Sequence, residues 1–370
     1  MTKTVVVLGG SYAGLHIAHY LLKNASDIKV VLVSKNSHFF WNLATVRAIV
    51  PGQIKDETIF QSLEKALQRY PDESYELIVG SAEKVDFGAK TVLVSAAAGG
   101  ERTLSYDHLV LATGSRNPSP DVPWKAAGSY EEAVKTLHAT ADKVKAAKHI
   151  VVAGAGATGV EVAGELGYEY GKGDKEVILL SAEKEIMGGD IVAPAARNEL
   201  TKLGVKIRGE AKVTGTKKLE NGKTEISLAN GETITTDLYL PTMGLVPNSE
   251  YIDAKYLNEK KNVVVDEFFN VKNTKDVWAA GDIVGSPRCG FMITQKHAAG
   301  VGKNIVAALS GKPPVVVKGP PIDILACAVG RGRGAGRMGS FKMFSIMIWL
   351  AKGRTLATQM VPGYIDGSVA

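Results

Sequence analysis

The chain is poor in cysteine. Its 370 residues include only Cys289 and Cys327, which lie 38 residues apart and form neither a Cys-x-x-Cys pair nor a metal-binding spacing. This scarcity excludes a redox relay through neighbouring cysteines and argues against a secreted protein stapled by disulfides. No metal site is predicted.

Long apolar runs are also missing. No stretch of about 18 apolar residues, the length needed to span a bilayer, occurs in the sequence. A strand is predicted from residue 4, which leaves no room for a signal peptide, and Thr2 does not permit N-myristoylation. We therefore expect a cytoplasmic location, with any membrane association peripheral.

No block of like charge stands out. The 44 Lys and Arg residues and 38 Asp and Glu residues are scattered and give a net charge of +6. This mild excess favours anionic cofactors or an anionic membrane surface, although an ordinary solvated surface explains it more simply. Basic residues are not interleaved with aromatic ones, so no nucleic-acid partner is expected.

An apolar strand at residues 4–8 runs into a glycine turn, and a helix is predicted over 12–24. Such a turn lets backbone amides and a helix N-terminus approach a pyrophosphate. Ser11 stands where the middle glycine is usual and is small enough to allow the same approach. The alternative is a strand, turn and helix that bind nothing. We predict FAD contacts at Gly9, Gly10, Ser11, Ala13 and Gly14.

The acidic residue usual about 20 residues after such a turn is absent. Ser34 and Lys35 occupy this place. We expect the serine hydroxyl to bind the ribose of FAD, and the lysine to meet a phosphate or cover the adenine.

A second glycine turn follows the strand predicted at 149–153 and is intact at all three glycines. We predict NAD(P)H contacts there at Gly154, Gly156, Thr158 and Gly159. The next strand, at 176–180, ends at Ser181 and Glu183. Glu183 would favour NADH, whereas Ser181 with Lys184 would admit the 2′-phosphate of NADPH. The balance leans only slightly to NADH.

Two more strand ends raise the specificity of these motifs. The first ends in Ala112, Thr113 and Gly114, a crossover that closes many flavin domains. The second ends in Gly281 and Asp282, where a carboxylate can accept hydrogen bonds from the ribityl chain of FAD. Asp282 as a helix cap is the alternative and is compatible with that role.

The order of these motifs predicts an α/β fold with two Rossmann-like doubly wound domains. We assign residues 1–122 and 242–312 to an FAD domain, which is interrupted by an NAD(P)H domain at 123–241. Residues 313–370 form a small C-terminal segment. Asn-Gly pairs at 221–222 and 230–231 predict hairpin turns inside the second domain.

The chain resembles the two-dinucleotide-binding flavoproteins, and most closely the apoptosis-inducing-factor-like group that includes the ferroptosis suppressor proteins. Type II NADH:quinone oxidoreductases are more distant. Beyond the glycine turns, the resemblance rests on residues 42–48, 159–165 and 329–331. The chain departs from the group at Ser34, at the non-acylated N-terminus and at 332–334.

This resemblance implies electron transfer from NAD(P)H through FAD to a quinone. It also implies that Glu161 positions the nicotinamide or receives a proton, the alternative being a carboxylate that only stabilises its own helix N-terminus. Lys296 and His297 are expected near the flavin, where a purely structural histidine is equally compatible with the sequence. By the same resemblance Arg47 would contact FAD, and Gly244 would contact NAD(P)H.

Residues 338–352 are apolar almost all round. We expect them to pack into the core, with peripheral membrane contact as the alternative. The leading function is an FAD-dependent NAD(P)H:quinone oxidoreductase. The alternatives are an NADH oxidase that reduces oxygen and a redox-sensing flavoprotein that acts through a partner. The oligomeric state stays open, a homodimer included.

Overall fold

The computed structural model describes residues 2–126, 128–173 and 175–370. One half is built on a seven-stranded sheet in which five parallel strands are followed by two antiparallel ones. In spatial order the strands are β18 (Val277–Ala279), β8 (His108–Leu111), β1 (Lys3–Leu8), β2 (Ile28–Ser34), β5 (Tyr75–Asp86), β6 (Thr91–Ala96) and β7 (Glu101–Ser105). Because both faces of the parallel part are covered, β1 is apolar over most of its length.

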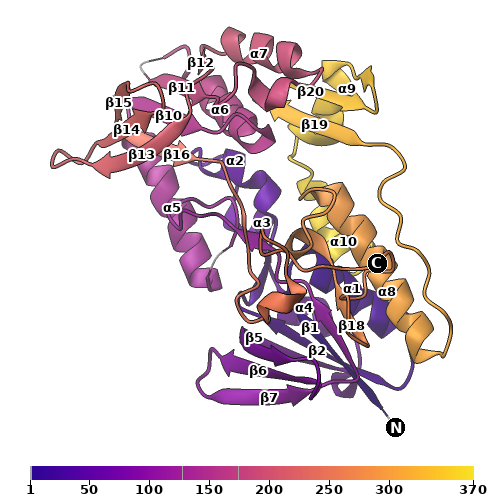
Figure 1. Cartoon of the computed structure of the whole chain (residues 1–370). Helices are drawn as coiled ribbons and strands as arrows, with labels where there is room; N and C mark the ends of the chain where they lie inside the picture. The colour runs from indigo at the N-terminus through magenta and orange to yellow at the C-terminus, as the bar shows by residue number, and fades with distance from the viewer. Residues whose placement is uncertain (1, 127, 174) are drawn as a thin grey trace.

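Helices α1 (Tyr12–Asn24) and α8 (Phe291–Leu309) pack against each other beside this sheet (Figure 1). Helix α1 spans the residues predicted from the apolar spacing. The other face of the sheet is covered by chain from a much later part of the sequence, because Tyr251, Val263 and Val271 share its buried cluster. The helices and this second cluster hold the carboxyl ends of β1, β8 and β18 rigidly in place.

The other half is built on a four-stranded parallel sheet. Its strands, in spatial order, are β12 (Lys206–Arg208), β11 (Glu176–Leu180), β10 (His149–Ala153) and β16 (Leu238–Pro241). The helices of this half are α5 (Tyr130–Ala146), α6 (Ala157–Tyr170) and α7 (Ala193–Lys202). The sequence prediction of two Rossmann-like α/β units is confirmed.

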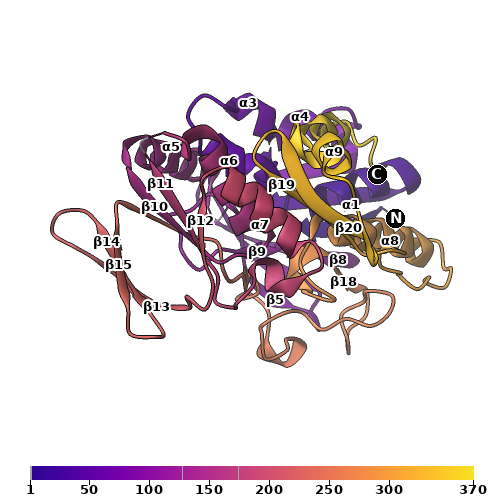
Figure 2. The same cartoon turned by 90° about the horizontal axis from the view of Figure 1, so that it is seen from above.

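An antiparallel meander projects from this second half (Figures 1 and 2). It consists of β13 (Val213–Lys218), β14 (Thr224–Leu228) and β15 (Thr233–Thr236). The turns at its tips contain Gly222 and Gly231, whose φ angles of +81° and +85° are those that glycine adopts most readily. The hairpins predicted from the Asn-Gly pairs are therefore confirmed.

The chain crosses between the halves twice, and the two crossings lie side by side. The outgoing crossing contains β9 (Ser115–Arg116), the returning one contains β17 (Val246–Pro247), and the two pair antiparallel. The first half is thus assembled from two separate stretches of sequence. Of the domain limits that we propose, the one after residue 122 falls in the outgoing connection, the one after 241 at the end of β16, and the one after 312 shortly beyond the end of α8.

Residues after α8 form a third part that packs against α6 and α7 (Figure 2). Its elements are β19 (Ile324–Val329), β20 (Arg333–Met338), β21 (Phe341–Lys342), α9 (Ser345–Ile348), a π-helical turn η6 (Trp349–Gly353), η7 (Thr358–Met360) and α10 (Val361–Ile365). The end of the chain returns to the first half, where Trp41 donates its indole N–H to the carbonyl of Leu356 at 2.9 Å.

The expectation that 338–352 packs into the core is wrong for most of its apolar side chains. Gly339, with a φ of +60°, reverses the chain between β20 and β21. Ile348 is buried beneath β20, whereas Phe341 and Phe344 are 77% and 78% exposed. The run is therefore not one helix but a strand end, a short strand, α9 and the π-helical turn.

Short elements complete the first half and bring several side chains to the site described below. They are β3 (His38–Phe40), η1 (Asn42–Ala44), α2 (Thr45–Ala48), α3 (Asp56–Ile59), β4 (Phe60–Ser62), α4 (Leu63–Leu67), η2 (Asp72–Ser74), η4 (Ala254–Tyr256) and η5 (Gly281–Ile283). The second half also contains η3 (Ile186–Gly189).

Candidate active site

A cavity of about 1380 Å³ lies where the two halves and the C-terminal segment meet. Its walls include the carboxyl ends of β1, β8 and β18, the first turns of α6, and Ala351 and Lys352 of the π-helical turn. Ordinary small-molecule pockets measure about 300–1,000 Å³. This larger space suits an extended dinucleotide together with a second ligand.

The first glycine turn forms one end of the cavity. Gly9 has a φ of +112°, and a Cβ there would lie 2.3 Å from the carbonyl oxygen of Ala112. A Cβ on Gly14 would lie 1.7 Å from the carbonyl oxygen of Gly9. Helix α1 can therefore approach the turn this closely only because residue 14 is a glycine. The remaining contacts predicted for this turn also line the cavity, namely Gly10, Ser11 and Ala13. This cradle fits the pyrophosphate of a dinucleotide.

Ser34 and Lys35 both line the same end of the cavity. The hydroxyl of Ser34 donates to the carbonyl of Asn36 at 2.6 Å, which leaves its oxygen able to accept a hydrogen bond. Lys35 is exposed and, within the described part of the chain, has no carboxylate partner. This end of the cavity is therefore free to receive a ribose and an anionic group.

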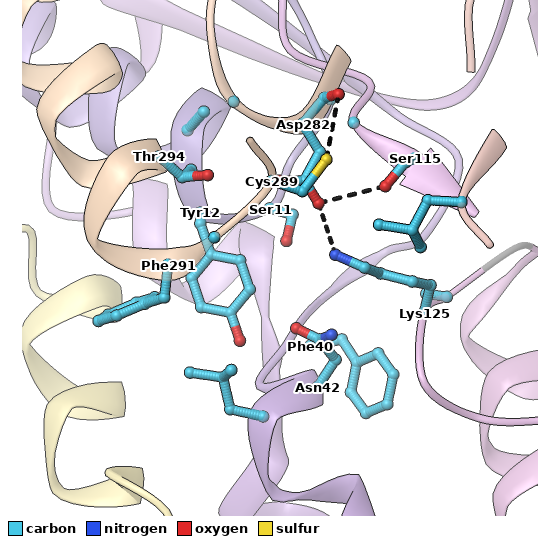
Figure 3. Close-up of a pocket in the computed structure, with 18 of the residues that line it drawn as sticks. Ser11, Tyr12, Phe40, Asn42, Ser115, Lys125, Asp282, Cys289, Phe291 and Thr294 are labelled. Carbon is cyan, nitrogen blue, oxygen red and sulfur yellow. Dashed lines mark hydrogen bonds and ion pairs between the residues drawn. The ribbon is translucent and has the colours of Figure 1, made fainter. Parts of the chain in front are cut away.

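Asp282 lines the cavity, and its carboxylate meets the side chains of Lys125 and Ser115 there (Figure 3). Its Oδ2 accepts from Lys125 at 2.7 Å and from the hydroxyl of Ser115 at 3.2 Å. Burial opposes ionisation, but the Lys125 ammonium, the Ser115 hydroxyl and a backbone N–H of Gly290 together lower the pKa of Asp282. The carboxylate is therefore ionised and ready to accept further hydrogen bonds. Gly281, Ala112, Thr113 and Gly114, which the sequence also assigned to FAD, line the same walls.

Neither thiol of the chain is activated. Burial, reinforced by the Asp282 carboxylate, raises the pKa of Cys289 to about 11. Burial and the Glu161 carboxylate raise the pKa of Cys327 well above its usual range. Both thiols are free and protonated at neutral pH, so neither supplies a thiolate nucleophile.

The second glycine turn faces the cavity from the other half. Gly154 has a φ of +100°, and a Cβ on Gly159 would lie 1.8 Å from the carbonyl oxygen of Gly154. Thr158 and Gly244 line the cavity, whereas Gly156 and the other two glycines of the turn stand behind its wall. The geometry is again that of a dinucleotide cradle.

Ser181 and Glu183 lie beyond the cavity, after β11. Ser181 is buried and donates its hydroxyl to the carbonyl of Glu185 at 3.0 Å. Glu183 is exposed. The carboxylate of Glu183 is thus more accessible to a ribose than the hydroxyl of Ser181.

Glu161 projects from α6 into the cavity wall and is almost fully buried. Its Oε1 lies 2.5 Å from the Nζ of Lys352 and accepts from the backbone N–H of Ala328 at 3.0 Å. Burial alone would lower the pKa of Lys352, but the Glu161 carboxylate and the Cys327 thiol outweigh it and raise the pKa. The pair is a preorganised group in the wall of the cavity.

Three further predicted site residues also lie outside the cavity wall. The Arg47 guanidinium is turned away and donates to Glu165 at 2.7 Å, so a flavin contact has no support from its placement. Lys296 is exposed on α8. His297 packs against Phe269, with ring centroids 4.2 Å apart, and burial lowers its pKa to about 4. A neutral, buried histidine favours the structural alternative for His297.

Sequence reasoning missed Lys125 and Lys352 as well as an aromatic wall. The rings of Tyr12 and Phe291 have centroids 5.4 Å apart and both line the cavity (Figure 3). Trp41 and Tyr364 back them, at 5.3 and 5.6 Å from Tyr12. Tyr12 follows the glycine turn directly, which was a usable signal. Lys125 lies in a connecting segment and Lys352 in the π-helical turn, and neither stretch carries a motif.

A family model described as pyridine nucleotide-disulphide oxidoreductase matches residues 3–303. The chain belongs to this family. Its cofactors are accordingly FAD and a nicotinamide dinucleotide, NADH or NADPH, and its activity is that of an NAD(P)H-dependent oxidoreductase. The family name refers to disulphide chemistry, but the two cysteines of this chain are free and neither is activated.

Individual relatives support the assignment. The chain is 37% identical to oxidoreductase ptaL of Pestalotiopsis fici, over 99% of this chain and 100% of the relative. It is 27% identical to ferroptosis suppressor protein 1 of Xenopus laevis, over 95% and 93% of the two chains. A water-forming NADH oxidase from Lactobacillus brevis, solved with NADH bound, has a TM-score of 0.73 at 22% identity and is matched over 91% of this chain and 75% of its own. The last likeness concerns the fold.

The Lys125–Asp282 ion pair yields a prediction about FAD binding. Replacing Lys125 by Met leaves a buried carboxylate without its cation, close to the place of an anionic diphosphate, so we expect the Kd for FAD to rise about tenfold, roughly 1.4 kcal/mol. Lys125→Met with Asp282→Asn should recover most of the affinity. Quenching of flavin fluorescence on titration of the apoprotein measures Kd.

The matched control for this experiment is Lys90→Met. It breaks an ion pair with Asp276 of similar length, 2.8 Å, outside the cavity, and should leave the Kd unchanged. An unchanged Kd in Lys125→Met would show that the pair has no part in flavin binding.

Proposed function

We propose that the chain is an FAD-dependent NAD(P)H:quinone oxidoreductase in which Glu161 and Lys352 serve the reacting ends of nicotinamide and acceptor. One observation carries this proposal. A buried carboxylate and ammonium lie 2.5 Å apart in the cavity wall, where both dinucleotide halves meet the C-terminal segment. No other buried pair among the described residues lines this cavity with one partner from the second half and the other from the C-terminal segment.

The flavin, when bound, accepts hydride from the nicotinamide and passes two electrons to the acceptor. The protein's own contribution is positioning and charge. The two glycine cradles would hold the two pyrophosphates, and Asp282 would accept hydrogen bonds from the ribityl chain. The N-terminus of α8 at Phe291 lines the cavity and would direct its partial positive charge at the flavin.

Lys352 holds a proton at Nζ under neutral conditions because its pKa is raised. Reduction of a quinone to a quinol consumes two protons at oxygen. An ammonium in the cavity wall stabilises the negative charge that develops on that oxygen and can deliver a proton to it. Glu161 keeps the ammonium charged and in place through the 2.5 Å contact.

The character of the cavity supports a quinone over a thiol or disulfide acceptor. The lining of the cavity that contains Lys352 includes apolar and aromatic side chains, among them Tyr12, Phe291, Ala357 and Met360. Thiol chemistry would need a thiolate, and the pKa of Cys289 is raised to about 11. The resemblance to the ferroptosis suppressor group points to the same acceptor class.

We propose NADH as the preferred donor. The exposed carboxylate of Glu183 follows β11, at the place where an acid accepts hydrogen bonds from the ribose 2′-hydroxyl. The same carboxylate repels the 2′-phosphate of NADPH, and the buried hydroxyl of Ser181 is already engaged with a carbonyl.

The proposal extends to a peripheral contact with an anionic lipid surface. No helix of the described chain is long and apolar enough to cross a membrane. Six apolar side chains near the cavity are nevertheless 43–78% exposed and form what we call the apolar patch, namely Met338, Phe341, Phe344, Ile346, Met347 and Leu350. The exposed Lys342 and Arg333 lie among the same elements. Apolar side chains with cations between them fit an interfacial site.

The proposed function predicts an anaerobic spectral cycle. Added NADH should bleach the flavin absorption of the purified holoprotein, and a short-chain ubiquinone should restore it before air is admitted. Stopped-flow absorbance measures both half-reactions. Recovery with oxygen but not with quinone would identify an oxidase instead, and failure of NADH to bleach the flavin would remove the proposal altogether.

The role of Glu161 predicts a selective loss of turnover. Glu161→Ala should retain FAD while NADH-driven quinone reduction falls about tenfold or more, as for a lost positioning or proton-transfer group. Glu199→Ala, which removes a carboxylate on α7 that is paired with Lys202 outside the cavity, is the control and should keep its rate. Equal rates for the wild type and Glu161→Ala would refute the assigned role.

The apolar patch predicts binding to anionic vesicles. Wild-type protein should float with phosphatidylserine-containing vesicles, and Phe341→Ser with Phe344→Ser should lose most of this binding while its rate with a water-soluble quinone stays unchanged. Val315→Ser removes an apolar side chain that is 67% exposed elsewhere and serves as the control. Flotation of the double variant at wild-type levels would refute the contact.

A further inference from the structure

A second buried ion pair lies one helical turn beyond Glu161. Glu165 follows Glu161 by four residues on α6, so both carboxylates lie on the same face of the helix. Arg47 donates to Oε1 of Glu165 through Nε at 2.9 Å and Nη2 at 2.7 Å, and the side chains are only 7% and 1% exposed.

The same guanidinium also holds the backbone beside Lys352. Its Nη2 donates to the carbonyl of Gly353 at 2.7 Å, and its Nη1 donates to the carbonyl of Arg354 at 2.9 Å. Gly353 ends the π-helical turn that carries Lys352. Arg47 therefore ties the first half, the second half and the C-terminal segment together at one point.

The π-helical turn has a third anchor. The indole N–H of Trp349 donates to the carbonyl of Arg331 at 2.7 Å. The Arg331 guanidinium in turn contacts Glu165 at 3.3 Å and Glu169 at 2.7 Å. Turns of this kind are rare and occur frequently at functional sites. Here every anchor leads back to α6, the helix that presents Glu161.

Stability alone is a weak reason for such an arrangement. Burying two charges costs about as much as their attraction returns, and apolar side chains of similar volume often stabilise a protein equally well or better. What an apolar pair cannot do is fix the carbonyls of Gly353 and Arg354 at the C-terminal end of the turn. The hydrogen bonds of Arg47 therefore serve to position the turn that carries Lys352.

We propose that Arg47 is a positioning residue that, together with Glu165, fixes the π-helical turn and so holds the Nζ of Lys352 against Glu161. Its chemical importance rests on the proposed function of that pair. We call the Arg47–Glu165 pair with its two carbonyl contacts the clamp. Thr45 and Val46, which precede Arg47 in α2, line the cavity, so the clamp also fixes this part of the cavity wall relative to Glu161 and Lys352.

The test measures Lys352 directly. Arg47→Met with Glu165→Met removes both charges of the pair at similar volume and leaves Arg331 its contact with Glu169. In the purified holoprotein, acetylation of Lys352 by acetic anhydride at pH 8, quantified by peptide mass spectrometry, should rise at least fivefold over the wild type. Lys125, which is paired with Asp282, serves as the internal control and should not change.

Two further variants keep the test decisive. Arg47→Lys keeps the charge but cannot bind a carboxylate and two carbonyls at once, so acetylation of Lys352 should rise in this variant too. It tests the proposal if the double variant does not fold. Arg337→Met breaks a 2.8 Å ion pair between β20 and Asp190 and should leave Lys352 protected.

Unchanged acetylation of Lys352 in a folded Arg47 variant that retains FAD would overturn the proposal. Because this measurement needs no turnover, it is independent of the acceptor. Increased acetylation without loss of quinone reduction would support the clamp and refute the assigned chemistry of Lys352.

Discussion

At Gly9 and Gly154 the backbone adopts φ angles of +112° and +100°, and the helix that follows each turn approaches so closely that a Cβ on Gly14 or Gly159 would overlap a carbonyl oxygen. The remainder of the architecture depends on this close approach. One strand of each parallel sheet ends in such a turn. The carboxyl ends of β1, β8 and β18 line the cavity from the first half, and the start of α6 together with Thr242, which follows β16, lines it from the second. Two turns that are 145 residues apart in the sequence thus serve one cavity.

How much the sequence reveals depends on how local each feature is. The bounds of α1 were predictable to the residue, because the glycine turn lies directly before it and apolar spacing continues to its end. The positions of both glycine turns followed from the same local pattern. The ion pairs of Lys125 and Lys352 did not, since each lysine acquires its partner only when segments far apart in the sequence have packed.

Arg47 shows the opposite error. It belongs to a recognisable motif next to cavity-lining residues, so a flavin contact was a natural expectation. Its side chain points to the other side of α2 because Glu165 and two backbone carbonyls, more than 100 residues away in sequence, together provide better acceptors.

In 338–352, composition predicted burial, but the reversal at Gly339 divided the run and left Phe341 and Phe344 facing outward.

The pairing of β9 with β17 has a consequence for the history of the chain. The outgoing and returning strands are neighbours, with Arg116 opposite Val246. The two ends of the segment between them therefore lie side by side. A unit whose two ends lie together can be inserted into a host domain, or exchanged for another, without disturbing the host's sheet. The nicotinamide half therefore has the form of a cassette, and grafting it onto the flavin half of a different relative requires joining the chain at only two adjacent points.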